Sequence, residues 1–125
     1  MPGKARWGQV WWVEGNLPER KRHVIVSENG WNETFGTVLA VRLTTSPRHH
    51  PGPGFPLITE RPRTIAVYGQ LASWHEDSLV EHVEALTPRQ MRSIAIGILE
   101  VTQAHRILGL THPEIAERIG ERRRG

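Results

Sequence analysis

Residues 37–45, with the sequence TVLAVRLTT, carry the most regular strand pattern in the chain and indicate its fold class. Successive side chains on a strand point to opposite faces, so every second residue shares a face. One of the two faces is entirely apolar: Leu39, Val41 and Leu43. We expect that face to meet the core, which places Arg42 and Thr44 side by side on the opposite, more polar face.

Further short apolar runs, bounded by turn residues, predict strands on both sides of this segment: 9–14, 23–27, 54–59, 64–71 and 80–85. The first of them is apolar on both faces, which indicates a central strand or one whose second face is covered. Pro56 restricts its own strand to an edge. The dipeptide Asn29-Gly30 predicts a turn within residues 28–36, and residues 46–56 are expected to form an irregular loop.

The apolar spacing changes to three and four residues after Thr87. Thr87, Pro88 and Gln90 form a helix start, with a capping threonine, a proline at the first helical position and a glutamine three residues after the cap. A stripe expected to face the core follows: Met91, Ile94, Ala95, Ile98, Val101 and Thr102. Gly109 is the expected stop, and a second capping pattern at Thr111 predicts a short terminal helix.

Strands followed by a helix predict a mainly β fold with a C-terminal helix. The expected architecture is a small antiparallel β-barrel or half-open sheet packed against one long α-helix. A chain of 125 residues supplies one such domain. We assign residues 1–108 to the barrel and its helix, and residues 109–125 to a short helical extension.

The composition excludes several classes of protein. The chain has no cysteine, so a disulfide scaffold, a thiol nucleophile and a zinc site with cysteine ligands are ruled out. A mean hydropathy of −0.43, with no apolar run near 20 residues, argues against a membrane span. The first residues contain no apolar segment typical of a secretory signal, and we expect a cytoplasmic protein.

The positive charge lies in the first half of the chain. Residues 1–63 hold nine basic and five acidic side chains, a net +4, whereas residues 64–125 have a net charge of −1. Fourteen of the sixteen basic residues are arginine, whose planar fork suits phosphate. This distribution indicates a polyanion partner or simply a solvated basic face. The five tryptophans are either core residues or stacking platforms for unpaired bases.

Few residues offer a recognisable chemistry. His49 and His50 have no partners at ligand spacing, so we expect no metal, and no phosphate-cradling glycine motif is present. Arg22, Arg42 and Thr44 remain. Cleavage of a phosphodiester without a metal needs a group that moves protons and a set of cationic or hydroxyl donors around the pentacovalent phosphate. Arginine and threonine supply such groups, although both are common on strand surfaces.

In the order of its segments the chain resembles the MazF/PemK family of toxins from toxin–antitoxin pairs. The resemblance runs from about residue 6 to residue 108. The segments that carry it are WGQVWWVE at 7–14, RHVIVS at 22–27, Asn32, LTTS at 43–46, GFPL at 54–57, VYGQLASW at 67–74 and LTPRQ at 86–90.

The resemblance implies a PemK-type or SH3-like barrel that works as a homodimer. It implies metal-independent, sequence-selective cleavage of single-stranded RNA, inhibited by a cognate antitoxin protein, with no cofactor. The family's catalytic arginine corresponds to Arg22, and its catalytic serine or threonine corresponds to Thr44. The remaining residues expected to bind RNA are Lys21, His23, Arg42, Thr45, Ser46, Arg48 and Gln70.

The sequence departs from the family pattern at four places. His23 replaces a proline, Ala72 replaces a basic residue, Arg42 stands where the family usually has a small residue or proline, and the first loop, residues 15–21, is short. His23 is either a proton-transfer group or a strand residue that points to the other face. Two other functions therefore stay open: a poison of DNA gyrase like the related CcdB proteins, and a catalytically degenerate member that binds RNA or an antitoxin.

Overall fold

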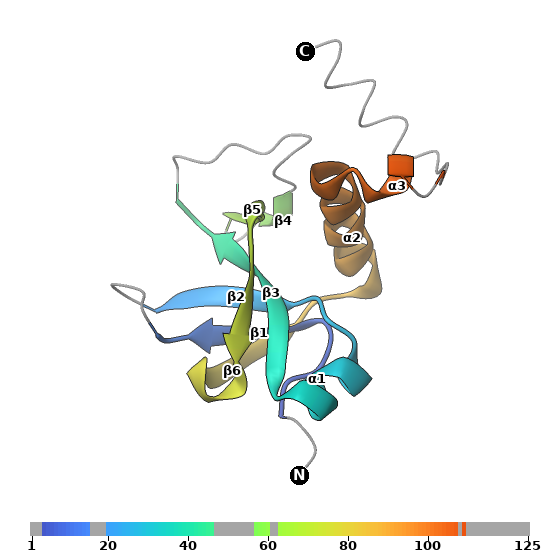
Figure 1. The fold of residues 1–125 in the computed structure, drawn as a ribbon. Helices are drawn as coiled ribbons and strands as arrows, with labels where there is room; N and C mark the ends of the chain where they lie inside the picture. The colour runs from blue at the N-terminus through green and yellow to red at the C-terminus, as the bar shows by residue number, and fades with distance from the viewer. Residues whose placement is uncertain (1–3, 16–19, 47–56, 61–62, 108, 110–125) are drawn as a thin grey trace.

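The computed structural model describes residues 4–15, 20–46, 57–60, 63–107 and 109. Its strands are β1 (Gln9–Val13), β2 (Lys21–Ile25), β3 (Thr37–Thr44), β4 (Leu57–Glu60), β5 (Arg63–His75) and β6 (Leu79–Ala85). Its helices are α1 (Asn29–Phe35), α2 (Pro88–Thr102), α3 (Ala104–Ile107) and the 3-10 turn η1 (Glu76–Ser78). The predicted mainly β fold with a C-terminal helix is confirmed (Figure 1).

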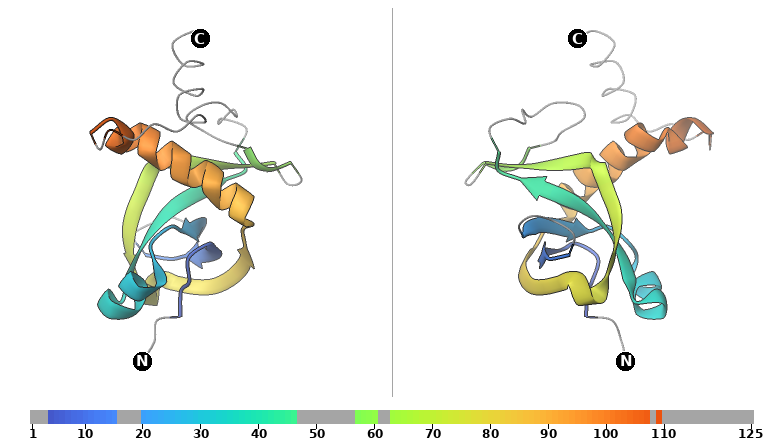
Figure 2. Two further views of the ribbon diagram at one scale, coloured as in Figure 1. Left: turned by 90° about the vertical axis from the view of Figure 1, so that its right-hand side faces the viewer. Right: turned by 60° about the vertical axis from the view of Figure 1, so that its left-hand side comes forward.

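All of these strands belong to one antiparallel sheet in the order β4-β5-β3-β2-β1-β6. Among the described strands, β4 and β6 form the two edges and do not pair with each other, so the sheet that these strands form is not closed. The strand predicted at residues 54–59 overlaps β4, which lies at an edge with β5 as its single neighbour among the described strands, while residues 54–56, Pro56 included, lie outside the described residues. Figure 2 shows that the sheet curls, with α2 lying across one side of it.

Both faces of the sheet are buried. On one face, Val10, Val24, Val41 and Leu43 pack against a cluster that includes residues of α2. On the other face the curled sheet encloses a second cluster: Ala5, Trp11, Val13, Ile25, Val38, Ala40 and Leu79, with Trp74 packed against it. The alternation of β1 between these two clusters explains why its sequence is apolar on both faces.

The second cluster corrects the expectation for β3. Val38 and Ala40, expected on the more polar face, are fully buried, whereas Leu39, expected in the core, is 39% exposed. Curling of the sheet gives the predicted polar face its own core. α2 needs a similar correction: Ala95, Val101 and Thr102 are exposed, whereas Ile96 and Glu100 are buried.

The start of α2 agrees with its sequence signal, and its end does not. The Thr87 hydroxyl accepts a hydrogen bond from the Gln90 backbone, and the Gln90 side chain accepts one from the Thr87 backbone. The helix ends at Thr102, well before Gly109, because Gln103 takes a left-handed backbone with φ 57°. The predicted terminal helix at Thr111 lies outside the described residues.

Residues 29–35 form α1, where the sequence predicted a turn. Asn32, fully buried, makes the decisive contacts: its amide nitrogen lies within hydrogen-bond distance of the Ala5 and Ser27 carbonyl oxygens, and its oxygen accepts from the Ser27 hydroxyl. Ser27 in turn accepts a hydrogen bond from the Leu39 backbone. These tertiary bonds override the local turn signal, and Gly36 ends the helix at φ 64°.

Gly8 joins three distant segments. Its N–H donates to the Ile25 carbonyl at 2.8 Å, and its carbonyl accepts from the Leu86 N–H at 2.9 Å. The φ of 87° lies in a region that favours glycine. The N-terminal segment is thereby fixed to the end of β2 and to the residues that lead into α2.

Replacing Asn32 by alanine should lower the free energy of unfolding by about 3 kcal/mol, since three hydrogen bonds of about 1 kcal/mol each are lost and the buried Ser27 hydroxyl loses its acceptor. Chemical denaturation measures the change. Thr34→Ala, at an exposed position of the same helix, is the control and should stay within about 0.5 kcal/mol of wild type. Equal losses in the two variants would contradict the role of the buried amide.

Candidate functional site

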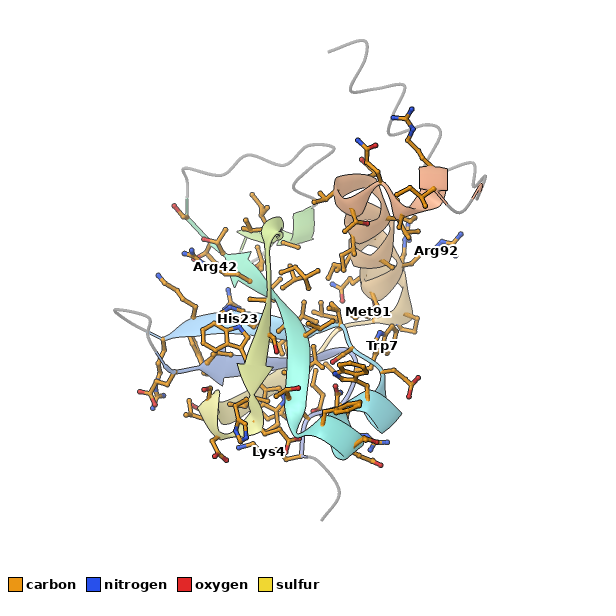
Figure 3. The ribbon with its side chains drawn as sticks, in the orientation of Figure 1. Lys4, Trp7, His23, Arg42, Met91 and Arg92 are labelled. Atoms are coloured by element: carbon orange, nitrogen blue, oxygen red, sulfur yellow. The ribbon has the colours of Figure 1, made fainter. Side chains whose placement is uncertain are left out.

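The candidate site lies where β2 begins and β3 ends. The two strands are antiparallel, and His23 is opposite Arg42 in their register. Continuing that register places Lys21 opposite Thr44, the last residue of β3. The fold therefore brings Lys21, His23, Arg42 and Thr44 to one end of the sheet, and Figure 3 shows His23 and Arg42 close to one another there.

Arg22 and Thr44 leave the sheet on opposite faces. Arg22 alternates with His23 and shares the face of Val24, which packs with Val41 and Leu43. Thr44 lies on the other face, with Arg42 and Ala40. In the described part of the chain, no hydrogen bond joins the Arg22 side chain to the Thr44 side chain.

The partner of Arg22 is Trp12. The two residues are opposite one another in the β1–β2 register, and the Arg22 guanidinium carbon lies 6.0 Å from the centre of the Trp12 ring. Reasoning from the sequence did not single out Trp12 as a site residue. The pairing depends on the β1–β2 register, which a single strand pattern does not give.

His23 is an interior residue with 3% of its surface exposed. Its Nδ1 lies 3.1 Å from the Lys21 carbonyl oxygen, and because that oxygen only accepts, Nδ1 is assigned the hydrogen. The His23 ring meets the Trp74 ring edge-on, with 5.5 Å between the two ring centres. Burial lowers the pKa of His23, and the positive charge of Arg42 lowers it further, while the Lys21 carbonyl acts in the opposite direction.

Thr44 is 6% exposed, and its hydroxyl oxygen accepts a hydrogen bond from the Ser46 N–H at 3.1 Å. This bond occupies a lone pair and leaves the hydroxyl hydrogen to be donated elsewhere. Thr45 is exposed, and Ser46 is half-buried. Thr44 is therefore oriented by its neighbour and keeps its capacity as a donor.

The structure leaves two of the predicted RNA-binding residues wholly or partly undescribed. Arg48 lies outside the described residues. Gln70 belongs to β5, in the bulge where Val41 pairs with Leu71 and Arg42 pairs with Val67. The backbone of Gln70 thus lies beside the stretch of β3 that carries Arg42, and its side chain is outside the described set.

Within the described residues, no three histidine, cysteine, aspartate or glutamate side chains gather closely enough to hold a metal ion. In the same part of the chain, no helix has the length and apolar character needed to cross a membrane. The described residues of the candidate site are thus cations, hydroxyls and one buried imidazole.

No protein-family model matches the sequence, and no curated protein matches it. Solved structures do match. An endoribonuclease from a mycobacterial species is 23% identical, with a TM-score of 0.69 over 90% of this chain and 99% of that one. A mycobacterial endoribonuclease in complex with its cognate antitoxin is 25% identical, with a TM-score of 0.64 over 87% of this chain and 97% of the other.

A MazE–MazF complex from Deinococcus radiodurans is 14% identical, with a TM-score of 0.65 over 86% of this chain and 97% of that chain. The described strands and helices therefore have the architecture of these endoribonucleases and of MazF. The fold is that of MazF, which confirms the resemblance to the MazF/PemK family.

The buried imidazole makes stability depend on pH. Unfolding exposes His23 and returns its pKa to the ordinary value of 6.5. Between the lowered pKa of the folded state and 6.5, the unfolded chain binds a proton that the folded chain does not, so stability falls as the pH drops below about 6.5. We expect wild type to lose more stability between pH 7 and pH 5 than His23→Gln, as measured by denaturation at each pH.

His82→Gln is the matched control, because it removes an exposed histidine. It should keep the pH dependence of wild type. A wild-type curve that is parallel to the His23→Gln curve would show that the buried ring does not titrate as described.

Proposed function

We propose that this chain is the toxin of a type II toxin–antitoxin pair, a cytoplasmic endoribonuclease that cleaves single-stranded RNA sequence-selectively and without a metal ion. The observation that carries the proposal is the match over nearly the whole length of a mycobacterial endoribonuclease, 99% of that chain. The proposed barrel-like protomer acts as a homodimer, as the family resemblance implies.

The proposed reaction is an internal transfer at phosphorus. The ribose 2′-oxygen forms a bond to the adjacent phosphorus as its proton is removed, and the bond from phosphorus to the 5′-oxygen breaks as that oxygen gains a proton. Arg22 is assigned to proton transfer and to binding of the phosphate, and Thr44 donates its hydroxyl hydrogen to a phosphate oxygen. Because strand alternation directs these two side chains to opposite faces, the phosphate would lie past the strand ends, where both can reach it. Positive charge and donors at the phosphate stabilise the pentacovalent state more than the ground state.

The cations around these two residues would hold the RNA backbone. Lys21 and Arg42 are half-buried at the end of the sheet where Thr44 lies. Thr45, Ser46, Arg48 and Gln70 complete the proposed binding set. His23 is assigned an interior role beside Arg42, since a side chain that is 3% exposed offers little surface to RNA.

The proposed protein partner is a cognate antitoxin. Two of the matching structures are complexes of a toxin with its antitoxin. An antitoxin segment with acidic side chains would complement the cations at the end of β2 and β3, and would compete there with the phosphates of RNA. A small acidic protein encoded beside this chain is the expected candidate.

A binding protein without catalytic activity is the second candidate. The observation that favours it is the separation of Arg22 and Thr44 onto opposite faces of the sheet, together with the alanine at position 72, which is exposed. Such a protein would bind single-stranded RNA or an antitoxin and leave the RNA intact. A gyrase supercoiling assay distinguishes both candidates from a CcdB-like poison.

The test is incubation of purified protein with a set of single-stranded RNAs in the presence of EDTA. Cleavage should persist with the chelator. Arg22→Ala should reduce the rate by about 100-fold or more, as removal of one transition-state donor commonly does, and Thr44→Ala should act in the same direction. Thr44→Ser retains a hydroxyl and should recover most of the activity.

Arg89→Ala, at an exposed arginine on α2, is the control for loss of a positive charge. It should cleave RNA at nearly the wild-type rate. Intact RNA after treatment with excess wild-type protein, across many sequences, would reject the enzyme; RNA binding in the same samples would then favour the second candidate.

A further inference from the structure

Trp12 differs from its neighbour in the Trp11-Trp12 pair. Trp11 is buried in the second hydrophobic cluster, where it also lies near Lys4 and His82. Trp12 belongs to neither of the hydrophobic clusters described, and it is half-buried. A large aromatic ring is therefore placed beside the core with part of its surface open to solvent.

The position of Trp12 in the fold sets it apart from the helix. Figure 1 shows the hairpin of β1 and β2 extending away from α2, toward the side of the molecule opposite the helix. Val10 and Val24 lie in the cluster that includes α2 residues, whereas Trp12 and Arg22 follow on the same face toward the far end of the two strands. The ring thus lies beyond the part of the sheet that packs against the helix.

The contact with Arg22 is loose. A distance of 6.0 Å from the guanidinium carbon to the ring centre is at the outer end of the range for cation–π interactions, about 6 Å. The guanidinium therefore lies near the ring without being held tightly against it. Arg22 is half-buried as well, so an aromatic ring and a cation lie beside one another, each with part of its side chain exposed.

We propose that Trp12 stacks on an unpaired base of single-stranded RNA, next to the phosphate that Arg22 binds. The proposal rests on the proposed function, since it takes RNA as the ligand. A strand of RNA offers a base and a phosphate in each nucleotide, and an indole beside a guanidinium matches both groups. Stacking of a base on an aromatic side chain contributes about 1–3 kcal/mol and tolerates every base, because each has a flat π-surface.

The competing explanation is a purely structural pair. A cross-strand arginine and tryptophan also stabilise a hairpin through packing and the cation–π contact. The two roles differ in one measurable respect: a stacking residue distinguishes a strand with bases from a strand without them, and a structural residue does not.

The experiment measures binding of two fluorescently labelled oligonucleotides of equal length. One is fully 2′-O-methylated RNA, which lacks the attacking 2′-hydroxyl and is not cleaved, and the other is an abasic strand with the same phosphates. Trp12→Ala should weaken binding of the methylated RNA about 10- to 100-fold and leave binding of the abasic strand nearly unchanged. Trp12→Phe should recover most of the affinity.

Trp31→Ala is the matched control, because Trp31 is an exposed tryptophan on α1 whose ring contacts the Phe35 ring at a tilt of 44°. It should bind both probes as wild type does. Trp12→Leu keeps apolar bulk without an aromatic ring, and it replaces Trp12→Ala if the alanine variant does not fold.

Wild-type affinity for the methylated RNA in Trp12→Ala and Trp12→Leu would overturn the proposal, as would equal losses for the two probes or a wild-type protein that binds neither. Failure of the proposed function has a different signature. In that case wild type leaves ordinary RNA intact, while the dependence of binding on the ring at position 12 persists.

Discussion

The buried amide of Asn32 is the contact on which the arrangement of the sheet depends. It joins the N-terminal segment at Ala5, the segment after β2 at Ser27 and, through the Ser27 hydroxyl, the backbone of β3 at Leu39. A polar group with no exposure is stable only when its hydrogen bonds are made. The hydrogen bonds of Asn32 therefore fix these segments relative to one another. The β2–β3 register that follows sets His23 opposite Arg42.

Burial on both faces of the sheet explains why polar groups gather at the strand ends. Between the ends, β1, β2 and β3 alternate between two apolar clusters and leave little room for charge. At the start of β2 and the end of β3 the clusters stop, and lysine, arginine and threonine side chains take their place. Because both faces are apolar between the strand ends, the polar side chains of these strands lie at the ends.

Local patterns in the sequence predicted those elements whose determinants lie close together in the chain. The capping residues Thr87 and Gln90 act within one helical turn, and the alternation in residues 37–44 needs no distant partner. α1 was missed because the contacts of Asn32 reach 27 residues back to Ala5, which no local pattern records. Asn29-Gly30 is a dipeptide typical of turns, but tertiary hydrogen bonds stabilise a helix at this position instead.

The candidate site could be predicted only in part for the same reason. The residue types at Arg22 and Thr44 were readable, but their faces depend on how the sheet curls and on which strands pair. The contact of Arg22 with Trp12 follows from the β1–β2 register and is invisible in either strand alone.

The pairing of β1 with β6 has a consequence for the order in which the chain folds. β1 ends at Val13 and pairs with β6, which ends at Ala85. Most of the described sequence therefore lies between these two paired strands. During synthesis β1 exposes one row of backbone hydrogen-bonding groups until residue 85 has emerged, and α2 follows later still. Pairings this distant slow folding, and a chain interrupted before β6 would lack a finished sheet.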